Sequence, residues 1–197
     1  MVEAGSDKPV RRTPKRAVTA LAVTAVTTAL FGTGLASAQS GGVGAPGSTT
    51  TTTPTTTTAP AGSMVFPVGG SHTMGQGFGA PRSGHTHQGQ DIMAACGTSL
   101  VAVSRAKVKW VSFQRLAGNY VVIRNKKLHQ DYMYAHLSTR ASVTKGQVVM
   151  PGQQIGIVGE TGDATACHLH FELWLGKWYR GGHPTNPLPY LQTYQGY

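Results

Sequence analysis

The chain has 197 residues, a formal net charge of +10, and only 12% charged residues against 40% hydrophobic ones. This length allows one ordinary domain with tails, and the low charge together with 26 glycines argues against long charged helices. Two cysteines are too few for a Cys-rich zinc ribbon or a scaffold of several disulfides, so any metal must be bound mainly by histidines and carboxylates. The positive charge favours anionic partners such as nucleic acid, anionic lipid or acidic wall polymer, without choosing among them.

The first 38 residues have the pattern of a secretory signal peptide. A polar, basic start precedes the uncharged run 17–31, which is short for a membrane span. The small residues Ala36-Ser37-Ala38 then offer a cleavage site. We therefore expect a signal peptide over residues 1–38 and a secreted, extracellular or cell-wall-associated protein. The alternative is a membrane anchor that is retained because cleavage fails.

Residues 39–63 are rich in Thr, Pro and Gly and have no large apolar residue beyond Val43. Such a segment cannot offset the entropy of ordering, so we expect a disordered linker whose many hydroxyls are open to glycosylation. The working domain is then expected over residues 64–197. Twelve basic and five acidic residues follow residue 38, so the mature protein keeps a net charge of +7.

Short runs of β-forming residues separated by Gly-containing turns fill this domain. Residues 106–113 alternate between polar and apolar positions, as in a strand with one wet face, and no stretch keeps a helical period of 3.6. This pattern predicts a mainly β, antiparallel domain. The expected strands are 99–104, 106–113, 119–124, 131–138, 147–150, 153–159 and 168–174.

The candidate chemistry lies in two histidine clusters. In residues 168–172 (HLHFE), a strand places His168, His170 and Glu172 on one face and apolar side chains on the other. In residues 85–91 (HTHQGQD), His87 and Asp91 are four apart with a glycine between them, and could reach one ion. Either cluster alone is more often a set of ordinary histidines. Together, His87, Asp91 and one of the two strand histidines form the three-ligand set of a catalytic zinc site, although spacing does not decide which histidine.

Four motifs occur in a fixed order: H-x-G-x-D, Y-A-H-L, G-Q-x-I-G-x-x-G-x-T-G and H-L-H-F-E. In this order they resemble the lysostaphin-type, or LytM-like, zinc endopeptidases of bacterial cell walls, and the resemblance covers essentially all of residues 64–191. It implies a single antiparallel β-sheet domain of the duplicated hybrid motif type. It also implies an enzyme that hydrolyses peptide bonds in peptidoglycan crosslinks or stem peptides, glycyl bridges among them.

Carried over residue by residue, the resemblance implies that His87, Asp91 and His170 bind Zn²⁺, while His136 and His168 are the catalytic residues beside the scissile carbonyl. Strand parity predicts that His136 projects to the same face as Tyr132 and Tyr134. Glu172 is expected to orient a neighbouring histidine, and His85 to lie at the rim of the site. Which of His136 and His168 is the base is left open.

Some features depart from the family pattern or allow other functions. Ala166-Cys167 stands where the family commonly has Gly-Pro before the HLH strand. We expect a disulfide between Cys96 and Cys167, because export is oxidising and both cysteines lie near proposed zinc-site residues.

The other function considered is a non-catalytic wall-binding or hydrolase-activating module of the same fold. Expected partners are peptidoglycan and anionic wall polymers, with no nucleic acid, no membrane contact beyond an uncleaved signal segment, and a monomeric state.

Overall fold

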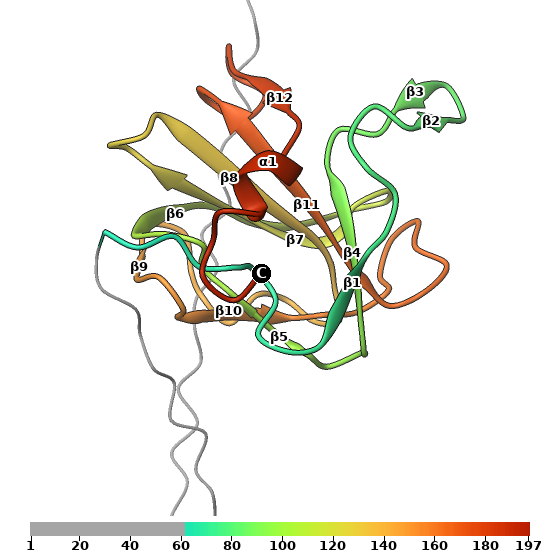
Figure 1. The fold of residues 1–197 in the computed structure, drawn as a ribbon, viewed down its shortest axis with the longest axis horizontal. Coiled ribbons are helices and arrows are strands. Elements are labelled where there is room, and N and C mark those ends of the chain that lie inside the picture. Colours follow the sequence, from blue (N-terminus) through green and yellow to red (C-terminus); the bar gives the residue numbers. More distant parts are fainter. Residues whose placement is uncertain (1–61) are drawn as a thin grey trace, which may run out of the picture. The chain divides into compact units, whose positions relative to one another are not determined.

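The computed structural model describes residues 62–197, so the expected signal peptide and all but the last two residues of the expected linker lie outside the described residues. Within this range, no helix is long and apolar enough to cross a membrane. The elements are almost all strands (Figure 1). They are β1 His72–Met74, β2 Pro81–Arg82, β3 His85–Thr86, β4 Gln90–Ala94, β5 Ser99–Val101, β6 Ala106–Gln114, β7 Gly118–Asn125, β8 Gln130–Leu137, β9 Val148–Val149, β10 Gln154–Ile157, β11 His168–Leu175, β12 His183–Thr185 and the short helix α1 Leu188–Leu191.

The main sheet has eight strands. Its order is β1-β4-β11-β8-β7-β6-β9, with β12 paired to β11, and every pairing is antiparallel. Two further antiparallel pairs, β10 with β5 and β2 with β3, lie outside it. The expected mainly β, antiparallel fold is confirmed.

All seven strands expected from the sequence are present, with β5, β9 and β10 shorter than expected. The sequence did not predict β1, β2, β3, β4, β12 or α1. These elements have two to five residues each, too few to show a period, and the strands among them are defined by their partners. For example, β4 is held between β1 and β11.

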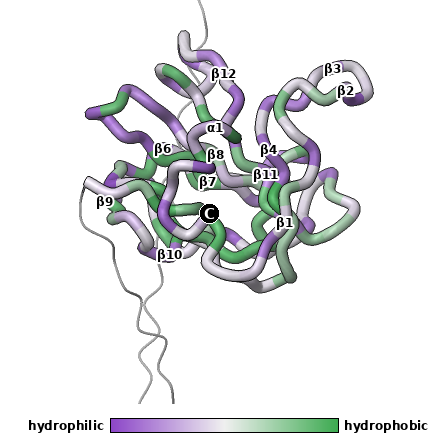
Figure 2. Tube along the Cα trace, viewed as in Figure 1, coloured by the Kyte–Doolittle hydropathy of each residue, from purple (hydrophilic) through white to green (hydrophobic). Residues whose placement is uncertain are grey.

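The two faces of the main sheet have different roles. On β11, Leu169, Phe171 and Leu173 are at most 1% exposed and belong to the main hydrophobic core, as the alternation predicts. Each such side chain contributes about 1.5–3 kcal/mol through its burial. Figure 2 shows the hydrophobic stretches gathered in the strands and the hydrophilic ones at the peripheral loops. The opposite face carries a small apolar cluster that includes Met133 and Ala135 of β8. This second face also presents the candidate site.

His136 does not share a face with Tyr132 and Tyr134, so the parity prediction is wrong. The two tyrosines are buried in the main core, whereas His136 lies in a cleft on the opposite face beside Met133. The cause is a break in β8: His136 has φ 60°, and the register of β7 with β8 shifts at this end of the pair. A left-handed backbone costs a non-glycine residue of order 1–2 kcal/mol. The backbone N–H of His136 donates to Ala117 O at 2.8 Å, which helps to hold this conformation.

Two close approaches bring the histidine clusters together. The pairing of β4 with β11 sets Asp91 directly opposite His170. Gly89 makes this possible, because a Cβ atom there would collide with the carbonyl oxygen of Phe171 and approach Cε1 of His170 at 3.0 Å. The turn after β4 is joined to the start of β11 by a disulfide between Cys96 and Cys167, with Cα atoms 5.3 Å apart.

Candidate metal centre and cleft

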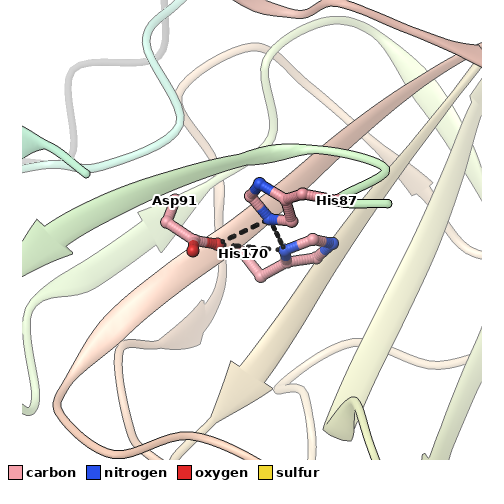
Figure 3. Close-up of side chains that lie close together, drawn as sticks. All are labelled: His87, Asp91 and His170. Atoms are coloured by element: carbon pink, nitrogen blue, oxygen red, sulfur yellow. Dashed lines mark hydrogen bonds and ion pairs between the residues drawn. The ribbon is translucent and has the colours of Figure 1, made fainter. Parts of the chain in front are cut away.

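His87, Asp91 and His170 bring one ligand atom each to a common point (Figure 3). His87 Nε2 and His170 Nδ1 are 2.8 Å apart, and each lies 3.0 Å from Oδ1 of Asp91. His87 lies between β3 and β4, three residues before β4 begins, while Asp91 is in β4 and His170 is in β11, so a rigid strand pair supports two of the three residues. The structure therefore gathers the three residues that the resemblance names as ligands.

The other ring nitrogen of each histidine is already engaged. His87 Nδ1 donates to the carbonyl oxygen of Gly77 at 2.8 Å. His170 Nε2 donates to Oε1 of Glu172 at 3.2 Å. When both rings are neutral, these bonds leave the inward nitrogens, Nε2 of His87 and Nδ1 of His170, as the atoms that carry lone pairs. Partners of this kind fix the tautomer of metal-binding histidines.

The donor set fits a zinc-type ion. Two imidazole nitrogens and one carboxylate oxygen are ligands that zinc accepts, and three protein ligands leave a position for water or substrate. Lone pairs that face one another at 2.8–3.0 Å repel each other unless a cation lies among them. The chemistry of these donors thus calls for positive charge at their common point, which a divalent metal would supply.

The electrostatics of the trio favour that charge. Burial alone would raise the pKa of Asp91, but hydrogen bonds from His170 and His87 hold it well below its ordinary value, so the carboxylate is ionised. Burial opposes charge on His170 too, yet hydrogen bonds to Asp91 and Glu172 raise its pKa to about 9. Both shifts have the direction expected where an ionised carboxylate and a positive charge lie together.

His136 and His168 lie beside His87 and His170, so that four histidines form one group. His136 Nδ1 donates to Thr161 O and His168 Nδ1 donates to Ala166 O, both at 2.8 Å. Their ring centroids are 4.7 Å apart, and His168 Nε2 lies 3.7 Å from Asp91 Oδ1. Burial lowers the pKa of His136 to about 4, so this ring is neutral at neutral pH. Within residues 62–197, no hydrogen bond engages Nε2 of either ring.

A cleft of about 640 Å³ opens beside these residues. Its lining includes the buried Met133, His136 and Glu172 and the exposed His85, which is consistent with the rim position expected for His85. His72, His129 and His183 do not line the cleft. The cleft therefore opens directly onto His87, His136 and His170.

Glu172 is buried and has three N–H donors. Besides His170, it accepts hydrogen bonds from Nε1 of Trp174 at 2.6 Å and from Nε1 of Trp178 at 3.1 Å. The expectation that Glu172 orients a histidine therefore agrees with the geometry. Its indole partners were not predicted, because nothing in the spacing of Trp174 and Trp178 distinguishes them from ordinary core residues.

Arg82 is the most important residue that the sequence reasoning missed. Its Nη2 donates to Oδ2 of Asp91 at 2.6 Å, and its side chain lines the cleft. In the sequence it counted only as one of the basic residues, because no motif marks it. Gly77 was missed for the same reason, since it acts through its carbonyl oxygen and any residue type has one.

Comparisons with known proteins agree with this geometry. Residues 85–187 match Peptidase family M23, which is just over half of the chain. Peptidoglycan DD-endopeptidase ShyC of Vibrio cholerae is 36% identical over 110 residues, covering 56% of this chain and 25% of that protein. Lysostaphin of Staphylococcus staphylolyticus is 32% identical over 113 residues, covering 56% of this chain and 23% of that protein.

Among solved structures, the catalytic domain of lysostaphin from Staphylococcus simulans is similar with a TM-score of 0.58 and 30% sequence identity. The match covers 62% of this chain and 93% of that domain. The chain spans only about a fifth to a quarter of the length of the curated relatives it matches. The shared region is thus the peptidase domain, and the chain belongs to Peptidase family M23.

Proposed function

We propose that the protein is a secreted, zinc-dependent endopeptidase that hydrolyses peptide bonds in bacterial peptidoglycan crosslinks or stem peptides. The observation that carries the proposal is the convergence of His87, Asp91 and His170 beside a second pair of histidines in an open cleft. The names of the relatives, a peptidoglycan DD-endopeptidase and lysostaphin, support the substrate class.

In this proposal His87 Nε2, Asp91 Oδ1 and His170 Nδ1 hold Zn²⁺. When bound, the ion supplies Lewis-acid chemistry, which polarises a carbonyl and makes water a better nucleophile. Gly77 O and Glu172 keep the two imidazoles in the orientation that binding needs. The Asp91 carboxylate offsets part of the positive charge of the ion.

His136 and His168 act as the proton-transfer pair. Peptide hydrolysis requires one proton to leave the attacking water and one to reach the departing amine, because an amine expelled as an anion is a very poor leaving group. Both rings are fixed through Nδ1 by backbone carbonyls. His168 Nε2 lies 3.7 Å from Asp91 Oδ1, and the ring centroids of His136 and His170 are 5.9 Å apart. A ring that carries a proton also donates a hydrogen bond to the oxyanion that develops on the carbonyl.

The remaining parts of the proposal concern where the enzyme works. Residues 1–38 would direct export, residues 39–63 would act as a tether, and residues 64–197 would form the peptidase domain, which works as a monomer. The net charge of +7 after residue 38 would draw the domain to anionic wall polymers through exposed residues such as Lys107, Lys126 and Lys127. This attraction should weaken as salt rises, because exposed charges are screened within about 8 Å at physiological ionic strength.

A non-catalytic wall-binding or activating module would be expected to lack part of the catalytic set. This chain has all five residues, and each ring has its second nitrogen engaged, which favours an enzyme. The test is incubation of the purified mature protein with purified peptidoglycan, with counting of the new amino groups. Release of amino groups by the wild type and not by His168→Ala supports the proposal. Binding to the wall without release by either protein would refute it in favour of the binding module.

A further inference from the structure

The motif G-Q-x-I-G-x-x-G-x-T-G, residues 152–162, ends beside one of the proton-transfer residues. The structure describes the whole motif, and none of its residues lines the cleft. Instead, the motif approaches the neighbouring strands backbone to backbone. A Cβ atom on Gly159 would collide with the backbone of Ser138, just after β8, and a Cβ atom on Gly118, the first residue of β7, would collide with Thr161. The end of the motif is therefore packed directly against the corner where β7 meets β8.

At this corner β8 has one residue more than β7. Asn119 pairs with Leu137 and Val121 pairs with Tyr134, so two steps along β7 correspond to three along β8. A bulge of this kind leaves one residue outside the ladder and turns a side chain to a new direction. His136, which lies within the bulge, has φ 60°. Such a conformation persists only where neighbouring groups fix it.

The hydroxyl of Thr161 is inserted between the two strands at the bulge. It accepts a hydrogen bond from the backbone N–H of Asn119 at 3.0 Å and donates one to the carbonyl oxygen of Leu137 at 2.7 Å. These backbone groups belong to two residues that the register pairs, so one hydroxyl joins β7 to β8. The side-chain amide of Asn119 adds only a longer bond, of 3.4 Å, to the same carbonyl. Thr161 thus holds the residue that directly follows His136.

The backbone of Thr161 holds the imidazole ring itself. His136 Nδ1 donates to the carbonyl oxygen of Thr161 at 2.8 Å. A neutral ring that donates from Nδ1 has its lone pair on Nε2. Any residue type offers a carbonyl, whereas a short side chain with a hydroxyl is found only in serine and threonine. The hydroxyl therefore fixes the place of the carbonyl that the ring needs.

A role in the local turn alone does not account for these bonds. A threonine that shapes a turn bonds backbone groups a few positions away. The partners of Thr161 lie 24 to 42 positions earlier in the chain, and all three bonds go to His136 or to the strand pair beside it. His168 differs, because its Nδ1 donates to Ala166 O, only two positions away. Long-range support is thus a particular feature of His136.

We propose that Thr161 is a positioning residue for His136. Its hydroxyl keeps the bulge in β8, and its carbonyl keeps the ring in the form that has the proton on Nδ1. Thr161 acts only through His136, since it does not itself line the cleft. Without the hydroxyl the ring takes up other orientations, and proton transfer becomes slower because it depends on exact placement. The catalytic part of this inference rests on the proposed peptidase function, whereas the placement of the ring can be measured separately.

The kinetic test compares the mature wild-type protein with Thr161→Val, Thr161→Ser and the control Thr165→Val, on soluble crosslinked peptidoglycan fragments. Valine keeps the shape of threonine and removes the hydroxyl, serine keeps the hydroxyl, and Thr165 is exposed in the same loop. We expect kcat of Thr161→Val to fall about tenfold to hundredfold, within the contribution of general acid–base catalysis, with KM and zinc content near those of the wild type. Thr161→Ser and Thr165→Val should stay close to the wild type.

The form of the ring is measured by NMR of the protein labelled with ¹⁵N in its histidines, because the two nitrogens of a neutral imidazole have different chemical shifts. The His136 signal is assigned by its loss in His136→Ala. It should show the proton on Nδ1 in the wild type, Thr161→Ser and Thr165→Val, and a mixture of both forms in Thr161→Val. A role in stability alone would lower the Tm of Thr161→Val and leave this signal unchanged. The proposal is overturned if Thr161→Val keeps the wild-type signal or the wild-type kcat, or if Thr161→Ser behaves like Thr161→Val.

A measurement on the wild type keeps the proposal testable if Thr161→Val does not fold. The backbone N–H of Asn119 should exchange slowly with solvent, because the Thr161 hydroxyl accepts its hydrogen bond. An N–H of Asn119 that exchanges as fast as an unprotected amide would overturn the proposal. A wild-type protein that does not hydrolyse peptidoglycan would refute the proposed function, whereas the NMR and exchange measurements would still decide how His136 is held.

Discussion

Removal of the Cys96–Cys167 disulfide should destabilise the domain substantially. The bond joins residues that are 71 positions apart in sequence. In the chain-entropy account, a crosslink that closes a loop of this length contributes about 4 kcal/mol by restricting the unfolded chain. For a domain of this size, a loss of that magnitude corresponds to a fall in Tm of roughly 10–20 °C.

The same change should reach the catalytic residues. Cys167 immediately precedes His168, whose backbone N–H donates to Gly159 O at 3.2 Å at the start of β11. Without the crosslink, the turn that carries Ala166 O, the partner of His168 Nδ1, is held by fewer contacts. We therefore expect a lower kcat in the reduced protein, with little change in bound zinc.

The assay is urea unfolding of the wild type and of the double variant Cys96→Ser/Cys167→Ser, each with and without reductant. Reductant should shift the midpoint of the wild type toward that of the double variant and leave the variant unchanged, which is the internal control. A double variant within about 1 kcal/mol of the wild type would refute the entropy argument. Two alkylatable thiols in the non-reduced, secreted protein would show that the bond does not form.

Three other predictions test the site and the core. Gly89→Ala should reduce zinc affinity and lower the free energy of unfolding by about 1–3 kcal/mol, because the new Cβ forces β4 away from β11. The control Gly69→Ala should be tolerated, since its Cβ would meet Ser99 at an ordinary 3.5 Å. Metal analysis and thermal unfolding test this, and equal behaviour of the two variants would contradict the packing argument. Alanine at a proposed ligand, His87, Asp91 or His170, should abolish both zinc binding and activity. Alanine at His136 or His168 should abolish activity while zinc stays bound. The same zinc content in both groups of variants would refute the assignment of ligands and proton-transfer residues. Burial raises the pKa of Tyr132, Tyr134 and Tyr194 in the folded state, whereas the unfolded chain loses the phenolic proton at its ordinary pKa of about 10. Above pH 10 the free energy of unfolding should therefore fall by about 1.4 kcal/mol per pH unit for each of these tyrosines. Urea unfolding between pH 9 and 11.5 measures this, and the absence of a fall would count against it.

The sequence could predict the parts of the fold that have a period. The strands from 106 to 137 and from 168 to 175 are long enough to alternate, and the alternation on β11 correctly separated the core residues from the histidines. The short strands β1, β2, β3 and β12 carry no such signal. Their existence depends on hydrogen bonds to strands that are distant in sequence.

The prediction that His136 shares a face of its strand with Tyr132 and Tyr134 was wrong for a physical reason. Alternation assumes an extended backbone at every position, and a single residue with positive φ reverses the face of everything that follows. Leu137 accordingly returns to the main core while His136 faces the cleft. Histidine has no intrinsic preference strong enough to announce a left-handed conformation, so the sequence could not show the break.

Within the site, the residues with chemistry in their side chains were predictable and their supports were not. The motifs named five residues that the structure brings together. Gly77 contributes only a carbonyl oxygen, and Arg82 reaches Asp91 from a two-stranded hairpin. Contacts of this kind depend on the path of loops, which short-range spacing does not determine.

The most direct test of the account is a metal titration of the mature protein on purified peptidoglycan. The protein is first stripped with a chelator, and Zn²⁺ is then added in steps while bound zinc and released amino groups are both measured. The account predicts that activity disappears on stripping and returns in proportion to zinc, reaching its maximum at one ion per chain, with no binding or return in His170→Ala. Hydrolysis that persists in the fully stripped protein, or full zinc binding by His170→Ala, would contradict it.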